Sequence, residues 1–466
     1  MKLAIDQVVF HPFSYGDWTG RVFSWQDDIY RAISGERAPF YQRLLSEGVL
    51  HDLMRRQLLI DTEIAGLEID GYVLVLKHRT IPFVSHCYEW CGEMLKAAAR
   101  SVLELERELL KRGLTLQDAH PYNVLFDGPT PTWVDLGSVV PMPPGEPWHA
   151  YEELLAFYTR PLKLMAAGHG HIARSLLRDA EAGIGQRDLA AITGTPFADI
   201  VIDAARTGVR SLTRKAFPSI RRRLSNAATR FVRRSKSSIG KEELIRRIDK
   251  AIQEIDSIRF VPPVSKNNGA GGSDFVPATN WTPLQRRVAQ ILVAKRPASV
   301  LHIGSNDGWY SQLAARNGVQ VVSVDRNESA VTKVFFDAVR GHLPILPLVA
   351  DFRNLNPLMA WAAAPGQAYV DRLRCEMVLA LSLVHHLVFE QNLNFELIVR
   401  GLSAFARHCL TVEFFGRDDR YVSTRLRHRF DWYSLENFLT ALKREFRDIE
   451  QFPSNEEDRW VLLCEK

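Results

Sequence analysis

The decapeptide SVLHIGSNDG occupies residues 299–308 and decides the fold expected for the C-terminal part of the chain. Its first five residues form an apolar run typical of a buried strand, and a turn containing Gly304 and Gly308 then leads into a helical pattern at Trp309. A dinucleotide-binding turn needs G-x-G-x-x-G so that the backbone can approach a pyrophosphate, but Asn306 and Trp309 stand at two of the glycine positions. The turn therefore indicates a ligand without a pyrophosphate.

Strand and helix patterns alternate around this turn. The strand-like runs are residues 299–303, 319–325, 347–351, 375–382, 408–415 and 459–465. The helical patterns are residues 282–295, 309–317, 328–340, 391–406 and 434–446. Strands separated by helices predict an α/β fold with a doubly wound parallel sheet, in which ligands bind at the carboxyl ends of the strands.

An acidic residue follows each of the first three strands. Asp307 lies in the first turn, where its carboxylate would repel phosphate and attract an ammonium group. Asp325 ends the second strand and suits two hydrogen bonds to ribose hydroxyls. Asp351 ends the third strand, where it could accept an adenine amino hydrogen while Phe352 packs on the ring. The spacing predicts one adenosyl ligand held along one rim of the sheet.

The fourth strand runs into LSLVHHL, residues 381–387, where the substrate would meet the methyl donor. His385 and His386 are the candidates for a catalytic base, because histidine titrates near neutral pH. The alternative is that this pair packs against the strand and holds the loop. Glu413, near the end of the fifth strand, is expected to line the acceptor side.

These motifs resemble the class I S-adenosylmethionine-dependent methyltransferases over about 185 residues. The resemblance implies a Rossmann-like sheet and S-adenosyl-L-methionine as the cofactor. The cofactor contacts that it implies are His302, Gly304, Ser305, Asn306, Asp307, Gly308, Asp325, Arg326, Asp351, Phe352, Leu381 and Ser382. The alternative is a nucleotide-free α/β domain whose glycines and aspartates only make turns.

Residues 115–138 read TLQDAHPYNVLFDGPTPTWVDLGS and resemble the catalytic and metal segments of kinase-like phosphotransferases, such as the aminoglycoside kinases. The resemblance implies an α+β domain that binds ATP and Mg²⁺. Asp118 would be the base, and Asn123 and Asp135 would be the metal ligands. The chain lacks a glycine-rich phosphate loop, and Arg31 falls where the strand lysine is expected.

This N-terminal domain therefore has three interpretations. It is an active phosphotransferase, a degenerate pseudokinase-type binding module, or a domain whose Asp and Asn residues only cap turns. The first interpretation makes the chain bifunctional.

A basic segment joins the two parts. Residues 206–241 contain 12 Lys or Arg and no Asp or Glu, which exceeds the net charge of +5 for the whole chain, so the remainder is acidic. This segment could bind nucleic acid or an anionic membrane surface, or it could be a helical arm that packs on the acidic remainder. We expect a kinase-like domain at 1–200, a basic helical connector at 201–265, a Gly- and Asn-rich flexible linker at 266–280 and a methyltransferase domain at 281–466.

The whole arrangement resembles a bacterial family of long methyltransferases that includes rhizobial nodulation proteins. That resemblance implies a small-molecule, glycan or lipid-linked acceptor. No apolar run is long enough to be a transmembrane segment, and the first residues do not resemble a signal peptide. Five cysteines are few and odd in number, which favours a reducing compartment, and we expect a cytoplasmic protein. The pattern leaves the acceptor atom and the oligomeric state open.

Overall fold

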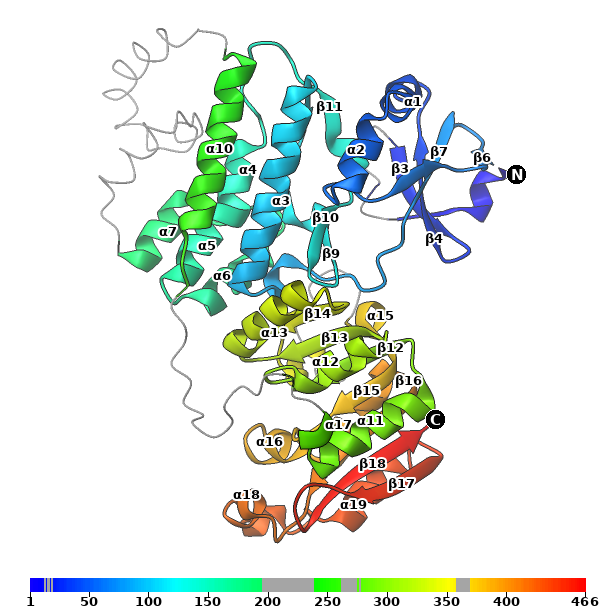
Figure 1. The fold of residues 1–466 in the computed structure, drawn as a ribbon, viewed down its shortest axis with the longest axis vertical. Helices are drawn as coiled ribbons and strands as arrows, with labels where there is room; N and C mark the ends of the chain where they lie inside the picture. The colour runs from blue at the N-terminus through cyan, green and yellow to red at the C-terminus, as the bar shows by residue number, and fades with distance from the viewer. Residues whose placement is uncertain are drawn as a thin grey trace.

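A computed structural model describes residues 1–11, 14, 17, 20–194, 239–260, 275, 278–357 and 369–466. The N-terminal half combines small antiparallel sheets with a layer of helices (Figure 1). The C-terminal half is built on one seven-stranded sheet with helices on both faces (Figure 1). The chain is therefore a mixed α/β protein, as the sequence predicts.

The N-terminal half begins with a five-stranded antiparallel sheet in the order β2-β3-β4-β7-β5. Its strands are β2 (Val9–Phe10), β3 (Gly20–Trp25), β4 (Asp28–Ile33), β5 (Thr62–Ile64) and β7 (Leu74–His78). β1 (Lys2–Leu3) pairs with β6 (Glu68–Ile69), and the helices α1 (Ala38–Ser46) and α2 (Val49–Arg55) follow β4.

α3 (Gly92–Lys111) is the central helix of this half, and its apolar face is buried. It packs beside α10 (Lys241–Ser257), whose buried Leu244, Ile248 and Ile252 recur at helical spacing. The predicted connector is therefore not a separate unit where it is described, because α10 shares the core of the N-terminal half (Figure 1). Most of the basic segment, residues 206–238, lies outside the described residues.

The other elements of this half surround α3. They are β8 (Leu114–Leu116), β9 (Val124–Asp127), β10 (Thr130–Trp133), β11 (Val139–Pro141), α4 (Tyr151–Leu154), α5 (Arg160–Ala166), α6 (Gly170–Leu176) and α7 (Gln186–Thr193). β9 and β10 form a hairpin that reaches toward the C-terminal half (Figure 1).

The C-terminal sheet has the order β14-β13-β12-β15-β16-β18-β17. The first five strands in this order are parallel, as predicted. The prediction of a parallel sheet is wrong for β18, which runs antiparallel to both β16 and β17. β17 was not predicted at all. Its side chains are mostly exposed on this edge strand, so it lacks the apolar run of a buried strand.

The strands of this sheet are β12 (Ser299–Ile303), β13 (Gln320–Asp325), β14 (Ile345–Val349), β15 (Cys375–Ala380), β16 (Ala406–Phe415), β17 (Asp448–Pro453) and β18 (Arg459–Glu465). The helices are α11 (Pro283–Lys295), α12 (Trp309–Arg316), α13 (Glu328–Gly341), α14 (Phe352–Leu355), α15 (Tyr369–Leu373), α16 (Val384–Phe389), α17 (Phe395–Phe405), α18 (Arg420–Ser423) and α19 (Leu435–Leu442). α11 and α12 contribute to the core on one face, and α16, α17 and α19 contribute to the core on the other.

The two halves share a buried interface. The guanidinium of Arg372, just before β15, forms an ion pair with Glu89 of the N-terminal half, and both side chains are 1% exposed. Glu328, the first residue of α13, accepts a hydrogen bond from the backbone of Gly92 at 3.1 Å. Its other carboxylate oxygen pairs with Arg174 at 2.5 Å. The halves are thus held by charged groups as well as by a common apolar cluster.

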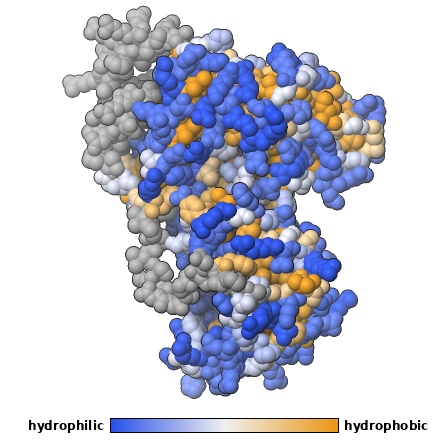
Figure 2. Space-filling view, viewed as in Figure 1, coloured by the Kyte–Doolittle hydropathy of each residue, from blue (hydrophilic) through white to orange (hydrophobic). Residues whose placement is uncertain are grey.

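The face of the molecule in Figure 2 is mostly hydrophilic, with hydrophobic residues gathered over the N-terminal sheet. The exposed hydrophobic residues of this half include Val9 on β2, Ile64 on β5 and Val73 just before β7. Of the helices that the structure describes, none has both the length and the apolar character required to cross a bilayer.

Candidate active site

The loop after β12 has a backbone that requires glycine. Gly304 and Gly308 have φ angles of 72° and 77°, and Asn306 has a φ of 47°. A Cβ on Gly308 would lie 2.4 Å from the side chain of Val334, and a Cβ on Gly304 would lie 2.9 Å from Leu383. The two glycines therefore allow the loop to turn tightly against α13 and against the segment after β15.

Asp325 organises this loop. Its Oδ2 accepts a hydrogen bond from the backbone N–H of Asn306, and its Oδ1 accepts one from Asn327, each at 2.8 Å. The carboxylate at the end of β13 thus ties the turn after β12 to the turn after its own strand. Each oxygen retains a second lone pair for a ligand hydroxyl.

The three predicted acids follow neighbouring strands. Asp307, Asp325 and Asp351 come after the carboxyl ends of β12, β13 and β14, which lie side by side and parallel. Asp351 caps α14 by accepting from the backbone of Arg353 at 2.9 Å. Its second oxygen accepts from the Gln391 amide at 3.1 Å. Sheet geometry therefore places the three acids along one rim.

Two predicted cofactor contacts point away from this rim. The ring of His302 is buried against α12, where its Nδ1 is hydrogen-bonded to Ser311 Oγ at 2.9 Å. The ring of Phe352 is buried beside Gly401 of α17. The expectation that these two side chains contact a ligand does not match their positions, because each completes the core on one face of the sheet.

Glu413 holds the segment after β15 in place through hydrogen bonds to Ser382. Oε2 of Glu413 accepts hydrogen bonds from the backbone N–H of Ser382 at 3.1 Å and from its Oγ at 2.8 Å. Oε1 accepts from Ser454 at 2.5 Å. Burial raises the pKa of Glu413, and the bonds from Ser454 and Ser382 oppose that rise. With a side chain 1% exposed, Glu413 positions the turn at Ser382 and does not line an open acceptor face.

His385 is a packing residue. Its ring stacks on Phe415 at 4.0 Å and is buried, and Leu381 nearby is also buried. Burial, with smaller contributions from His386 and Arg459, lowers the pKa of His385 to about 2. The ring of His385 is therefore enclosed and a weak base, which does not fit its predicted role in proton transfer.

The buried histidines predict a pH dependence of folding. Burial lowers the pKa of His302 to about 3 and that of His385 to about 2, whereas both titrate near 6.5 in an unfolded chain. Below pH 6.5 the unfolded chain binds more protons, so the free energy of unfolding decreases as the pH falls from 6.5 toward 3. We expect His385→Phe to reduce this slope by about 1.4 kcal/mol per pH unit in urea titrations at several pH values.

His428→Phe is the matched control, because His428 is fully exposed. An unchanged slope in His385→Phe would show that His385 is protonated in the fold.

His386 is the histidine that remains available. Its side chain is 40% exposed, and its Nδ1 donates to Glu390 Oε1 at 2.7 Å. Tyr421 also donates to this oxygen, at 2.9 Å, and Arg326 donates to the other oxygen at 2.9 Å. A carboxylate only accepts, so Nδ1 of neutral His386 carries the proton and Nε2 keeps its lone pair.

Burial alone would raise the pKa of Glu390, but hydrogen bonds from His386 and Tyr421 lower it below its ordinary value, so the carboxylate stays charged. The sequence interpretation missed Glu390 and Gln391. The spacing of four residues from His386 to Glu390 on one helix could have indicated the pair.

The kinase-like residues also lie near one another. Asn123 Nδ2 donates to Asp118 Oδ1 at 2.8 Å, and the backbone N–H of Val134 donates to the carbonyl of Asn123 at 2.9 Å, next to Asp135. Burial, followed by the charges of Asp135 and Glu153, raises the pKa of Asp118 to about 7. Within the described ranges, no three His, Cys, Asp or Glu side chains form a group that could hold a metal ion.

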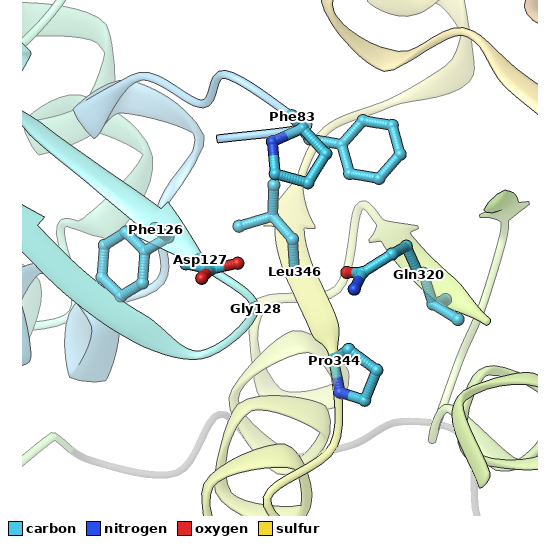
Figure 3. Close-up of a pocket in the computed structure, with 9 residues that line it drawn as sticks. Phe83, Phe126, Asp127, Gly128, Gln320, Pro344 and Leu346 are labelled. Atoms are coloured by element: carbon cyan, nitrogen blue, oxygen red, sulfur yellow. The ribbon is translucent and has the colours of Figure 1, made fainter. Parts of the chain in front are cut away.

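Two cavities in the described part of the chain lie away from these sites. The first, of about 10 Å³, is a crevice between the halves, where the β9–β10 turn at Gly128 meets Pro344 before β14 (Figure 3). Asp127, Gln320 and Leu346 also line it. It has room for about one water molecule. The second, of about 250 Å³, lies between α2, β7 and the β9–β10 hairpin. Neither is lined by a predicted site residue.

The chain is similar over most of its length to a curated relative. It is 26% identical over 455 residues to the nodulation protein NoeA of Rhizobium meliloti (strain 1021). The aligned region covers 94% of this chain and 92% of the relative. No family model matches the chain.

Several solved structures share a partial likeness with this chain. The bifunctional kinase-methyltransferase WbdD is 16% identical over 38% of this chain, with a TM-score of 0.29, and the match spans only about two fifths of WbdD. The magnesium protoporphyrin IX methyltransferase ChlM of Synechocystis PCC 6803, solved with bound S-adenosylmethionine, is 16% identical over 39% of this chain and 77% of its own length, with a TM-score of 0.29.

Proposed function

We propose that the C-terminal half transfers a methyl group from S-adenosylmethionine to a hydroxyl-bearing acceptor. The observation that carries this proposal is the row of Asp307, Asp325 and Asp351 after three adjacent parallel strands. The full-length similarity to NoeA agrees with the resemblance to long methyltransferases of that group.

The residues at the rim fit an adenosyl ligand. The Asp325 carboxylate can still accept hydrogen bonds from two ribose hydroxyls, and the Asp351 carboxylate can still accept one from an amino group. Ser305 Oγ is buried in the loop and has no hydrogen-bond partner among the described residues, so it could bond a polar ligand atom. The ligand would be approached by the backbone, and not the side chains, of Gly304, Asn306, Gly308 and Ser382.

S-adenosylmethionine, when bound, supplies a methyl group on a positively charged sulfur. A hydroxyl acceptor must lose its proton as it takes the methyl group, so a base at this position accelerates the reaction. Nε2 of His386 can take that proton, and the Glu390 carboxylate stabilises the imidazolium that forms. Glu413 fixes the turn at Ser382 beside it. The chain then contributes mainly by orienting the acceptor hydroxyl toward the methyl group and by taking up the proton of that hydroxyl.

His386→Ala tests this assignment. We expect kcat for release of S-adenosylhomocysteine to fall by about 100-fold or more, because a general base contributes about 10²–10⁴. Cofactor affinity should stay within about twofold of wild type. The measurement uses tritiated S-adenosylmethionine and a panel of sugars, oligosaccharides, lipid-linked sugars and phenols. Glu390→Gln should lose about tenfold, since it leaves the base in place without its charged partner.

The matched control is His428→Ala, which removes a fully exposed histidine of the same half. It should transfer methyl groups at the wild-type rate. Equal rates for His386→Ala and wild type on every active acceptor would rule out His386 as the base. Absence of any labelled product with the whole panel would count against hydroxyl methylation itself.

We propose a small-molecule, glycan or lipid-linked acceptor, supported by the similarity to a nodulation protein. We also propose a cytoplasmic location, since all five cysteines are free and buried. The basic segment 206–241 remains a proposed contact for nucleic acid or an anionic membrane surface. Salt-sensitive binding to RNA or to anionic vesicles that is lost on neutralising residues 221–234 would support such a contact.

A further inference from the structure

Arg31 carries a buried charge in the N-terminal half. It lies on β4, and its side chain is buried in the contact between the small sheet and the segment after β10. Its Nη2 donates to Asp135 Oδ1 at 2.7 Å, and its Nη1 forms an ion pair with Asp17 in the connection between β2 and β3. One guanidinium thus bridges two carboxylates from segments far apart in the sequence.

This arrangement does not fit a magnesium ion. Asp135 is the acid to which the kinase-like resemblance assigns the metal, and its Oδ1 already accepts from Arg31 and from the Gly137 backbone at 3.0 Å. Arginine stays protonated at every physiological pH, so loss of a proton cannot release the guanidinium from the Asp135 carboxylate. Charge-assisted bonds to a guanidinium are also among the strongest hydrogen bonds in proteins.

A divalent cation on Oδ2 of Asp135 would be repelled by the guanidinium charge beside it, and a cation on Oδ1 would have to displace Arg31. The displaced guanidinium would either remain buried without its carboxylate partners or force the small sheet away from the segment after β10. Either outcome reduces the apparent affinity for a metal by about 100-fold or more, because breaking a buried pair is costly.

We propose that Arg31 takes the place of the metal ion at Asp135. The N-terminal half is then a metal-independent module that does not carry out the magnesium-dependent phosphotransfer its Asp118, Asn123 and Asp135 resemble. The Asp17–Arg31–Asp135 bridge instead ties the small sheet to the rest of that half. This inference is independent of methyl transfer.

Manganese titration of the full chain, followed by the electron paramagnetic resonance of free Mn²⁺ with and without ATP, tests the proposal. Wild type should show no site that depends on Asp135. Arg31→Met removes the internal cation but leaves both carboxylates, so it should bind Mn²⁺ at least tenfold more tightly than wild type. Asp135→Asn in the Arg31→Met background should abolish that gain.

Two results would overturn the proposal. One is a wild-type Mn²⁺ site, with or without ATP, that Asp135→Asn removes. The other is a folded Arg31→Met protein, checked by its circular dichroism, that binds Mn²⁺ no better than wild type. If Arg31→Met does not fold, the comparison of wild type with Asp135→Asn decides alone, because the proposal requires equal Mn²⁺ binding by these two proteins.

Discussion

Asp325→Ala is expected to weaken S-adenosylmethionine binding by about two to three orders of magnitude. The carboxylate accepts backbone hydrogen bonds from Asn306 and Asn327, and in the proposed site it also accepts the ribose hydroxyls. Hydrogen bonds to a charged group are each worth about 1.5–3 kcal/mol, so losing two corresponds to at least a 100-fold change in Kd. The loop that holds Gly304 and Gly308 would also lose the bond that fixes its shape. Isothermal titration calorimetry of the full chain measures the change.

The matched control for this substitution is Asp448→Ala, because Asp448 is exposed on the far edge strand β17. Its Kd should stay within about twofold of the wild-type value. Asp325→Asn keeps one acceptor oxygen and should lose about tenfold. If Asp325→Ala bound the cofactor as tightly as Asp448→Ala, the assignment of the ribose site would be wrong.

Arg372→Met is expected to lower the free energy of unfolding by about 3–5 kcal/mol. The Arg372 guanidinium donates to the Glu89 carboxylate at 2.5 and 3.1 Å and to the carbonyl of Val84 at 2.5 Å, between the two halves. Removing the guanidinium leaves the Glu89 charge buried without its partner. Urea denaturation followed by circular dichroism measures the loss. The exposed pair Lys2–Asp70 provides the control, since Lys2→Met should leave the free energy of unfolding unchanged within the error of the measurement.

The double substitution Glu89→Gln/Arg372→Met separates charge from packing. It removes both buried charges, so it should be more stable than Arg372→Met alone. A double variant less stable than the single one would mean that the cost arises from lost side-chain volume and not from an unpaired carboxylate. A cost below 1 kcal/mol for Arg372→Met would mean that the interface opens to water.

Local patterns were sufficient to predict the central strands. β12 and β18 coincide with the predicted runs 299–303 and 459–465, because buried strands carry continuous apolar side chains. The direction of β18 could not be read in this way, since an apolar run is the same in both orientations. β17 escaped prediction because an exposed edge strand lacks that run. The packing of α10 on α3 depends on contacts about 150 residues apart, which no local pattern reports.

The same distinction applies to the candidate site. The rim acids were predictable because each one lies at the end of a strand or in the loop after it, and parallel strands end at one edge. The choice between His385 and His386 was not predictable, because it depends on Phe415 covering one ring and on Glu390 and Tyr421 bonding the other. Arg31 was predicted at the position of the strand lysine, yet its bridge to Asp135 joins residues 104 apart in the sequence.

Hydrogen exchange of the full chain with and without S-adenosylhomocysteine tests the central claim most directly. If the rim binds one adenosyl ligand, the amides of the loops at 304–308, 325–328 and 350–353 should exchange more slowly with the ligand present. Peptides from the N-terminal sheet, such as residues 20–33, should be unchanged. Unaltered exchange in the three loops at saturating ligand, or protection confined to the N-terminal half, would contradict the account.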